Sequence, residues 1–316
     1  MPEGHTLHRL AERLNRLVVG QTWRVSSPQG RFSAGAARLN GRAPERAEAW
    51  GKQLFIHLGP DIWQVHLGLY GAFSFRGDEA FQAAGSLGAP RAFSDAQPLQ
   101  YDDDGWVIPD PPAGAVRARI HVQHGWADLR GPSRCEVLNP MQYESLIRRL
   151  GPDPLHQSEG GESDSRDQRL LDQFRTHLAA RRISIAAALM DQSVIAGVGN
   201  IYRAESLFVE GIDPDTPAQE LDPERVESLW KTLTTQMRDG VAEGFICTLR
   251  PEDPALGARG SDIHDYRAGR AARGGTASRR HWVYQHQGTP CLRCGATIAE
   301  RELQGRRLYW CPGCQS

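Results

Sequence analysis

Hydrophobic positions at the start of the chain repeat with the period of an α-helix. Within residues 6–19, apolar side chains recur at spacings of three, four and three and so share one helical face: Leu7, Leu10, Leu14, Leu17 and Val18. Gly20 follows directly, and a glycine at this position commonly ends a helix in the left-handed conformation. The pattern therefore predicts an amphipathic helix over residues 6–19 that closes at Gly20.

From about Trp23 to Val137 the pattern changes to short apolar runs with turn residues between them. Runs rich in Val, Ile, Phe and Trp at this spacing are typical of antiparallel strands. The clearest runs cover residues 54–58, 63–67 and 118–122. We therefore expect an antiparallel β-sandwich or barrel.

Residues 76–114 interrupt this strand-rich region. They are rich in Gly, Pro and Asp and show weak periodicity, which is unusual for so long a stretch inside a compact domain. We interpret them as a long surface insertion and leave open that they are disordered.

Beyond the strands, apolar positions return to helical spacing. A short helix is predicted over residues 143–150, and the Gly-, Pro- and polar-rich residues 151–168 predict a linker. Helices are then predicted over residues 169–180, 184–191, 199–209 and 223–243. Residues 248–279, rich in Arg, Gly and Asp, predict a mobile loop, and the aromatic run at 281–284 predicts a last strand.

Length and composition set the class of protein. A chain of 316 residues suggests two domains with room for a small module. We divide it into a β-rich domain, a linker, a helical domain and a terminal module at residues 1–150, 151–168, 169–280 and 281–316. No run approaches 18 apolar residues, so no membrane span is expected, and the N-terminus lacks an export signal. The sequence thus predicts a cytoplasmic α+β multidomain protein.

The charge balance excludes a globally basic nucleic-acid binder. The net charge is -1, from 37 basic and 38 acidic residues, which still leaves room for a locally basic face. Residues 267–307 contain nine arginines and only two acidic residues, Glu300 and Glu302. A charged run is often no more than a solvated surface, so this count supports a basic face without establishing it. Lys52 and Lys231 are the only lysines; a lysine retained in so arginine-rich a chain indicates a need for an ammonium group.

Four of the six cysteines crowd into the last 26 residues. They form two C-x2-C pairs separated by sixteen residues: Cys291, Cys294, Cys311 and Cys314. Each pair is a short turn that directs two sulfurs to one point, and this spacing is typical of a four-thiolate zinc site. Such a site has no open coordination position, so the sequence predicts one structural zinc ion without a catalytic role. Cys135 and Cys247 stand alone and are interpreted as small buried residues.

The first residues offer a second candidate for chemistry. Removal of Met1, usual before a small residue, would leave Pro2 with a free secondary amine. An α-amino group has a pKa of about 7.7–8.0, so a fraction is neutral and nucleophilic at neutral pH, and its attack on an aldehyde-like carbon gives an iminium. Glu3 is placed beside it for proton transfer. Taken alone, these residues favour the plainer interpretation of an ordinary chain start.

The order of the motifs changes that interpretation. The start and its helix are followed by Trp50-Gly51-Lys52-Gln53-Leu54 at the head of a strand, Ala196-Gly197-Val198-Gly199-Asn200-Ile201-Tyr202 between two helices, and the four-cysteine hairpin. This order resembles the formamidopyrimidine-DNA glycosylase and endonuclease VIII family of base-excision repair enzymes, and its actinobacterial-type endonuclease VIII members in particular. The resemblance covers nearly the whole chain apart from residues 76–114 and 248–279.

The resemblance implies a fold and a reaction. The fold is an N-terminal β-sandwich or barrel with its helix, a helix–two-turn–helix domain and a β-hairpin zinc finger. Pro2 would attack the anomeric carbon of a damaged nucleotide flipped from the duplex, and Glu3 would protonate the sugar and assist later proton transfers. Lys52 matches the lysine that binds phosphate and donates a proton in β-elimination. Arg306 matches the fingertip arginine assigned to δ-elimination.

Further positions match residues of the family that contact DNA. Leu69 and Tyr70 match the wedge of the endonuclease VIII branch, which reads Gln-Leu-Tyr, and Gly68 leaves one intercalating group missing. An alternating strand that buries both side chains would look the same in sequence. The remaining matches are Asn200, at a helix N-terminus that offers N–H groups to phosphate, Arg149, Arg307 beside the fingertip, and Arg130, where the purine-specific branch has a void-filling loop.

The chain departs from the family at positions 5 and 6. The family usually reads Pro-Glu-Gly-Pro-Glu or Pro-Glu-Leu-Pro-Glu, whereas His5-Thr6 replaces the second Pro-Glu here. The missing glutamate helps to hold the N-terminal amine, so its loss puts the position of the amine in question, with hydrogen bonding by His5 or Thr6 as a substitute. A subset of actinobacterial-type endonuclease VIII proteins shares His-Thr, which argues against a decayed enzyme.

The sequence therefore predicts a bifunctional DNA glycosylase and abasic-site lyase, with oxidised pyrimidines favoured because of Gly4 and the Leu69–Tyr70 pair. Its expected partner is double-stranded DNA that contains oxidised bases or abasic sites, bound by a monomer in the bacterial nucleoid. Three alternatives stay open: a preference for oxidised purines, a catalytically silent protein that binds damaged or structured DNA, and a zinc-ribbon regulator of nucleic-acid transactions. Retention of Pro2, Glu3 and Lys52 argues against the silent protein, since binding alone needs none of them.

Overall fold

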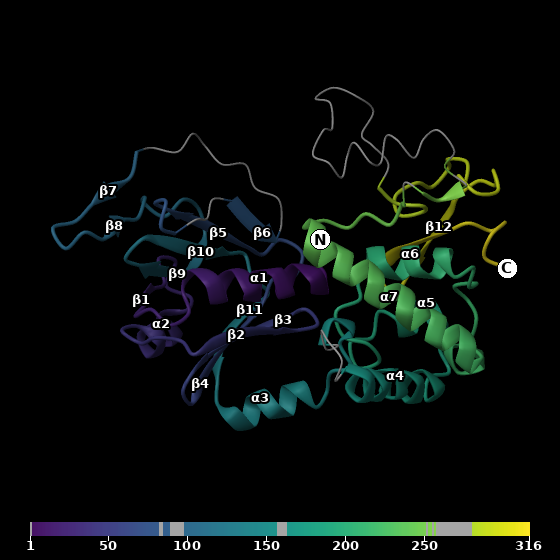
Figure 1. The fold of residues 1–316 in the computed structure, drawn as a ribbon, viewed down its shortest axis with the longest axis horizontal. Helices are drawn as coiled ribbons and strands as arrows, with labels where there is room; N and C mark the ends of the chain where they lie inside the picture. The colour runs from purple at the N-terminus through teal and green to yellow at the C-terminus, as the bar shows by residue number, and fades with distance from the viewer. Residues whose placement is uncertain are drawn as a thin grey trace. The chain divides into compact units, whose positions relative to one another are not determined.

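The computed structural model describes residues 2–81, 85–88, 98–156, 163–250, 252–254, 256 and 280–316 (Figure 1). The chain divides into two compact units, residues 1–149 and 150–316. Strands dominate the first unit and helices the second, as the change of hydrophobic period along the chain predicts.

Two antiparallel sheets make up most of the first unit. In spatial order, the first sheet contains β1 (Arg24–Ser26), β9 (Val116–Val122), β10 (Gly125–Arg130), β5 (Ala72–Gly77) and β6 (Gly85–Gly88). The second sheet contains β11 (Arg134–Leu138), β4 (Asp61–His66), β3 (Gln53–Leu58) and β2 (Arg46–Trp50). The unit also contains a two-stranded sheet and two helices besides the N-terminal one: β7 (Gln100–Tyr101) with β8 (Val107–Ile108), α2 (Ser33–Leu39) and α3 (Pro140–Ile147).

The core of the first unit is formed by the inward faces of both sheets. Alternate residues of each strand join one buried cluster, among them Leu54, Ile56 and Val65 from the second sheet and Phe73, Phe75, Ile120 and Leu129 from the first. Trp63 lies in this cluster, with its ring stacked on Phe32 at 5.5 Å. The period-two alternation therefore decides which face is buried, as in a β-sandwich.

Helix α1 (Gly4–Leu17) packs along β2 and β3. Its apolar stripe is buried as predicted. The Asn15 side-chain amide donates to the Ala47 carbonyl at 2.8 Å and accepts from the Ala47 N–H at 2.7 Å. This pairing satisfies the open edge of β2, which would otherwise expose unpaired backbone groups.

The end of α1 differs from the prediction in one detail. The capping residue is Val18, and Gly20 adopts φ +80° two positions later. Gly20 therefore reverses the chain after the cap instead of forming it. A β-branched residue ends this helix because the left-handed conformation is needed only beyond it.

The segment 76–114 is partly regular, which corrects its interpretation as an irregular surface insertion. It contains β6, β7 and β8, and Phe81, Leu87 and Val107 are buried. These three apolar anchors are too far apart in sequence to give a periodic signal, so the pattern could not reveal them. Residues 82–84 and 89–97 lie outside the described part of the chain.

Helices and one hairpin form the second unit. Its elements are η1 (Pro154–His156), α4 (Ser163–Ala179), α5 (Ile185–Ala188), α6 (Asn200–Val209), η2 (Ala218–Glu220), α7 (Pro223–Glu243), β12 (Ala299–Leu303) and β13 (Arg306–Trp310). One buried cluster joins Phe174 of α4, Leu207 of α6 and Leu233 of α7 to Leu308 of β13. The four helices predicted from periodicity are all present.

Residues 151–154 are buried, although the sequence predicts a linker there. The Gly151 N–H donates to the Gln192 carbonyl at 2.8 Å, and the Ala196 N–H donates to the Pro152 carbonyl at 2.9 Å. A Cβ at Gly151 would come within 2.6 Å of the Val194 backbone, so glycine is required here for close packing, not for flexibility. Helix α4 already begins at Ser163.

Residues 281–284 form bends and a turn where the sequence predicts a strand. The N–H groups of residues 282–284 donate to the side chain of Glu205 instead of to a neighbouring strand. Of the predicted mobile loop at 248–279, residues 251, 255 and 257–279 lie outside the described part of the chain. Among the described helices, none combines the length and apolar character needed to cross a lipid bilayer.

Candidate functional site

Pro2 and Glu3 are buried at the start of α1. Glu3 is the N-cap residue, but its backbone carbonyl accepts the Thr6 N–H at 2.9 Å and its carboxylate makes no capping bond. The carboxylate therefore lies inside the protein next to Pro2 without serving the helix. Burying an acid costs free energy, so the position of this carboxylate differs from that of an ordinary helix-capping side chain.

His5 and Thr6, which stand where the family has Pro-Glu, are also buried. The His5 Nε2 and Thr6 Oγ1 atoms lie 3.2 Å apart within hydrogen-bonding distance. Burial and the nearby charge of Arg9 lower the pKa of His5 to about 3. A neutral imidazole therefore occupies the position of the family's second proline, and Thr6, which carries no charge, occupies the position of the second acid.

The low pKa of His5 predicts a specific loss of stability in acid. Between pH 6.5, the ordinary pKa, and about pH 3, the unfolded chain binds a proton at His5 that the folded chain does not, so the free energy of unfolding falls as the pH falls. From about pH 7.5 to about pH 5 this amounts to about 2 kcal/mol. Urea unfolding should show that decrease in the wild type and a correspondingly smaller one in His5→Gln. Equal pH dependence in the two proteins would contradict a buried, neutral His5.

Lys52 lies in the tight turn between β2 and β3, next to Gly51 with φ +58°. The turn brings Lys52 near His66 at the end of β4, because Gln53 pairs with His66 across the strands. Burial, with the positive charges of Lys52 and Arg134, lowers the pKa of His66. The structure thus places the predicted catalytic lysine at the same end of the second sheet as the turn after β4.

That turn carries Leu69 and Tyr70, whose side chains are 44% and 75% exposed. Gly68 has φ +65°, and the Gly71 N–H closes the turn on the Leu67 carbonyl at 2.9 Å. The two side chains therefore project from a turn, which excludes the alternative of a strand that buries them. Exposed apolar side chains on a tight turn have the form needed to enter a base stack.

The same turn explains why position 68 is glycine. A Cβ there would lie 2.9 Å from the Ser133 Cβ. Ser133 is held in place because its Oγ lies 2.6 Å from His66 Nδ1. A third wedge side chain at this position would therefore require both the turn and the 131–133 loop to move.

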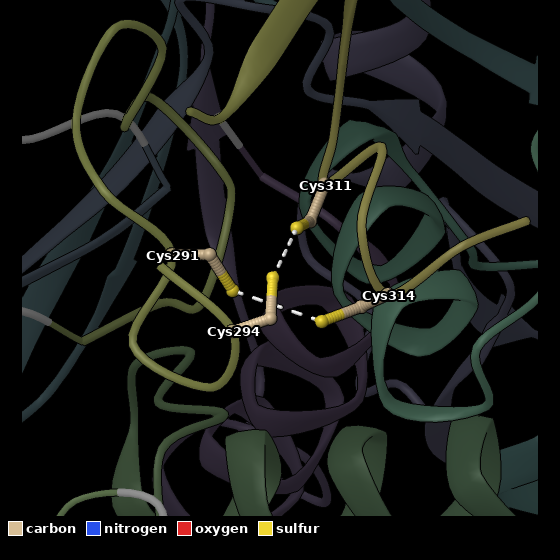
Figure 2. A group of neighbouring side chains, drawn as sticks. All are labelled: Cys291, Cys294, Cys311 and Cys314. Atoms are coloured by element: carbon tan, nitrogen blue, oxygen red, sulfur yellow. Dashed lines mark hydrogen bonds between the residues drawn. The ribbon is translucent and has the colours of Figure 1, made fainter. Parts of the chain in front are cut away.

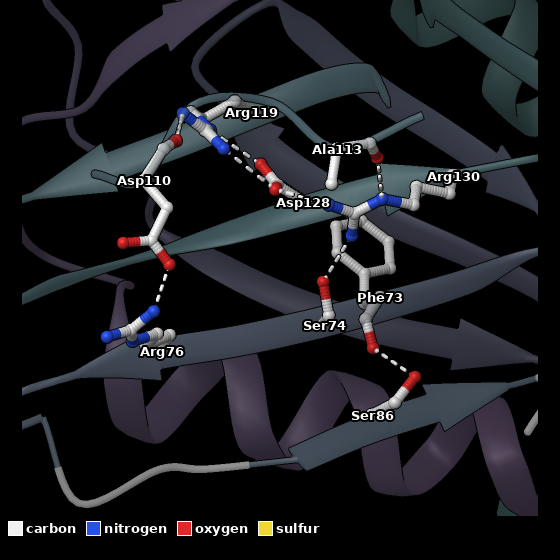
Figure 3. A network of polar contacts seen from close by, with 9 residues as sticks. All are labelled: Phe73, Ser74, Arg76, Ser86, Asp110, Ala113, Arg119, Asp128 and Arg130. Carbon is white, nitrogen blue, oxygen red and sulfur yellow. Dashed lines mark hydrogen bonds and ion pairs between the residues drawn. The ribbon is translucent and has the colours of Figure 1, made fainter. Parts of the chain in front are cut away.

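Arg130 lies at the end of β10, inside a polar network of the first unit (Figure 3). Its guanidinium donates to Asp128 at 2.8 Å, to the Ala113 carbonyl at 3.0 Å and to Ser74. Asp128 is buried and also binds Arg119 through both oxygens, at 2.6 and 2.9 Å. Arg130 is thus held by protein groups, and its contact with DNA stays a prediction.

Arg149 is exposed one turn beyond α3. That helix begins with a capping box: Asn139 accepts from Gln142 N–H at 2.9 Å, and the Gln142 side chain accepts from Asn139 N–H at 2.9 Å. Arg149 thus follows a helix whose start is defined by these capping bonds, and its contact with DNA stays a prediction.

In the second unit, the glycine-rich turn before α6 is organised by one side chain. Gln192 accepts from the Gly197 N–H and donates to the Val198 carbonyl, both at 3.0 Å. Gly197 has φ +94°, a conformation that glycine adopts without strain. The turn delivers Asn200 to the first position of α6.

Asn200 also joins the helix to the terminal hairpin. Its Nδ2 donates to the Arg307 carbonyl at 2.9 Å. The strands β12 and β13 meet at Gln304 and Gly305, with φ +51° and +69°, as a two-residue hairpin turn requires. Arg306 follows the turn directly, and the exposed Arg307 side chain donates to Glu300 at 3.3 Å. The structure therefore brings Asn200, Arg306 and Arg307 together.

The four terminal cysteines converge on one point (Figure 2). The sulfurs of Cys291 and Cys314 lie 3.9 Å apart and those of Cys294 and Cys311 3.4 Å apart, and all four lie within 4.8 Å of one another. A disulfide needs about 2 Å, whereas a zinc tetrahedron with bonds of about 2.3 Å has sulfur–sulfur edges of about 3.8 Å. The residues fit one structural zinc ion with no open position.

Sequence reasoning missed the polar residues that support these sites, of which Asp128, Arg203 and Glu205 are buried and Gln192 is half-buried. Asp128, Gln192 and Glu205 each organise a turn or an arginine, and Arg203 is fully buried. The available signal is a polar residue within an apolar stretch: Glu205 lies in α6 near Leu207 and Phe208. That signal does not identify the partners, which come from distant parts of the chain.

Comparison with known proteins agrees with this arrangement. Residues 1–105 match the formamidopyrimidine-DNA glycosylase N-terminal domain, residues 150–250 its H2TH domain, and residues 288–316 the zinc finger found in FPG and IleRS. Endonuclease 8 1 of Mycobacterium tuberculosis is 39% identical over all of both chains. A formamidopyrimidine-DNA glycosylase of Parasynechococcus marenigrum is 30% identical over 100% of this chain and 99% of its own. Lactococcus lactis Fpg, solved with DNA containing an abasic site, shares the fold with a TM-score of 0.66 at 20% identity and 99% coverage of each chain.

Proposed function

The chain belongs to the formamidopyrimidine-DNA glycosylase family, and we propose that it is a bifunctional DNA glycosylase and abasic-site lyase that acts on oxidised pyrimidines in duplex DNA. Membership makes it a base-excision repair glycosylase. The lyase step through Pro2 and the preference for pyrimidines are the parts of the proposal that need direct tests.

One observation carries the proposal: Glu3 is fully buried beside Pro2 and does not cap α1 with its carboxylate. An ordinary chain start has no reason to desolvate an acid. A general acid next to an amine nucleophile gains from such a site, because proton transfer contributes about 10²–10⁴-fold to rate.

In the proposed reaction the Pro2 nitrogen forms a bond to C1′ of the damaged nucleotide. The base departs with the electron pair of the glycosidic bond, and Glu3 protonates the ring oxygen as the sugar opens to an iminium. The iminium acidifies C2′, so loss of a proton there expels the 3′ phosphate; loss of a second proton, from C4′, expels the 5′ phosphate. Hydrolysis of the iminium returns the free amine. Lys52 and Arg306 hold the phosphates and supply protons to these two eliminations.

The wedge turn supports the choice of substrate. Leu69 and Tyr70 are exposed on it, and they match the pair used by the endonuclease VIII branch to fill the space left by a flipped base. The zinc ion takes no part in the reaction, since its four thiolates leave no position for substrate or water; its contribution is the shape of the hairpin that carries Arg306.

Borohydride trapping on a duplex with one abasic site tests the proposal. Reduction converts the iminium into a stable protein–DNA bond, so the wild type should give a shifted band on a denaturing gel. Pro2→Gly should give at least tenfold less, because it exchanges the secondary amine and its fixed ring for a flexible primary amine. Duplex binding is measured in parallel and should be the same for both proteins.

Two results would reject it. A wild type that binds the abasic duplex tightly but gives no band is a damage-binding protein without lyase chemistry. An undiminished band in Pro2→Gly that disappears in Lys52→Ala would transfer the nucleophile to the lysine.

A further inference from the structure

Glu205 lies in the middle of α6 and places a carboxylate in the interior of the second unit. It is fully buried. One oxygen accepts the N–H groups of Val283 and Tyr284 at 2.9 and 2.8 Å, and the other accepts the Trp282 N–H at 2.7 Å and the Thr248 hydroxyl. An ionised carboxylate only accepts hydrogen bonds, so four donors from two distant segments are collected on one side chain.

Both segments lie in the chain between α7 and the first cysteine pair. Thr248 follows α7, and Trp282–Tyr284 lead into the cysteine pairs. They are also bonded to each other, since the Thr248 N–H donates to the Arg280 carbonyl at 2.9 Å. Glu205 therefore fixes the point at which the chain enters the zinc-binding module.

The far end of the module is fixed to the same helix. Asn200 donates to the Arg307 carbonyl at 2.9 Å, and Arg203 donates to it at 3.2 Å. Three polar side chains of α6 thus hold the module at its entrance and beside its hairpin turn. Because the hairpin arginines and the N-terminus of α6 both face phosphate in the proposed function, their spacing matters to function.

We propose that Glu205 is a positioning residue for DNA recognition: by holding Trp282–Tyr284 and Thr248, it sets the zinc hairpin relative to the N-terminus of α6, so that Arg306 and Asn200 engage the phosphates of one damaged site together. This inference rests on the proposed function. Glu205 contacts neither substrate nor metal and acts only through the module.

Glu205→Gln is the most selective variant. The amide keeps the size of the side chain but replaces one acceptor oxygen with a donor NH2. If that group faces Trp282, two donors meet, and the N–H is left buried without an acceptor, which strains the entrance to the module. A shift of about 1 Å in a positioning element can lower activity by about a hundredfold.

The experiment compares the wild type, Glu205→Gln and Glu210→Gln on a duplex with one abasic site. Glu210 is the matched control, because it caps the end of the same helix and its carboxylate accepts a hydrogen bond from the Thr232 hydroxyl, outside the terminal module. We expect Glu205→Gln to raise KM at least tenfold and to lower the ratio of δ- to β-elimination products at least fivefold. Its kcat for β-elimination at saturating DNA and its zinc content of one ion per chain should stay within about twofold of the wild type. Glu210→Gln should match the wild type throughout.

The readouts separate positioning from a merely structural role. Equal KM and product ratio in Glu205→Gln and the wild type would overturn the inference. A variant that loses zinc and in which KM rises and kcat falls together would also overturn it, because that result indicates general unfolding of the module. Thr248→Val removes one donor with less disturbance and should shift KM and the product ratio in the same direction, which keeps the test decisive if Glu205→Gln does not fold. If the wild type shows no lyase activity, the proposed function fails, and the inference is judged by duplex affinity and its salt dependence alone: Glu205→Gln should then weaken binding and reduce the salt slope by about one phosphate contact.

Discussion

Replacing Glu3 with glutamine should lower the rate of base release at least a hundredfold and leave affinity for the lesion duplex within about twofold. Glu3 is buried beside Pro2, and its backbone, not its carboxylate, caps α1. The variant therefore keeps the helix and its packing while removing the proton that opens the sugar ring. General-acid groups contribute about 10²–10⁴-fold, and none of that contribution passes to an amide.

The measurement is single-turnover release of an oxidised pyrimidine from a duplex, with duplex affinity determined alongside. Glu12→Gln is the matched control, because Glu12 is an exposed residue of the same helix and the substitution makes the same change of charge. Base release at the wild-type rate in Glu3→Gln would place the general acid elsewhere. Equal losses in both variants would show that the effect comes from the charge of the helix and not from one buried acid.

Local patterns predicted the parts of the fold that local forces determine. The stripe of Leu7, Leu10 and Leu14 defines α1 because those side chains share one helical face and are buried together. The alternation in β3 and β4 identifies the inward face for the same reason. The cysteine spacing predicts the zinc site because each C-x2-C turn brings its own two sulfurs together before any long-range contact forms.

Contacts between residues far apart in the sequence determine the parts of the fold that the hydrophobic pattern could not predict. The aromatic run at 281–284 has the composition of a strand, yet the N–H groups of residues 282–284 donate to Glu205, which is more than 70 residues away in the sequence. The Gly151–Pro154 stretch has the composition of a linker, yet it is buried against the turn around Val194. In both cases the partner lies far along the chain, where neither periodicity nor composition carries its position.

The same distinction holds for the candidate site: the sequence could suggest its residues but not the distant residues that support them. Pro2, Glu3 and Lys52 are predicted as catalytic from the family resemblance of the ordered motifs, and their roles stay predictions. The turn of Leu69 and Tyr70 was open to two interpretations, and the structure shows that both side chains are exposed. The sequence could not predict which residues support this turn. The closeness of Ser133 leaves no room for a Cβ at position 68, and no feature of residues 131–133 alone indicates that they lie beside that turn.

Replacing Cys311 with serine should release the zinc ion and lower affinity for abasic duplex at least a hundredfold, while the first unit stays folded. Cys311 and Cys291 are zinc ligands and also members of the buried cluster that contains Phe208, Trp282 and Tyr309. Structural zinc contributes on the order of 10 kcal/mol to such a module, so its loss opens this cluster and releases the hairpin that carries Arg306. Among the described residues, the buried clusters of the first unit contain none beyond Ile147, and the unfolding of this unit should be unchanged.

Cys135→Ser is the control, because it makes the same substitution at a thiol outside the zinc site; the Cys135 sulfur accepts a hydrogen bond from the Trp63 indole at 3.4 Å. Zinc content, duplex affinity and thermal unfolding of the three proteins complete the test. Cys135→Ser should keep one zinc ion and wild-type affinity. If Cys311→Ser loses zinc but still binds the duplex as tightly as the wild type and still forms δ-elimination products, the hairpin is not a DNA-binding element, and Arg306 does not supply the proton for the second elimination. Retention of binding without δ-elimination products would instead assign affinity to α6 and confine Arg306 to the chemical step.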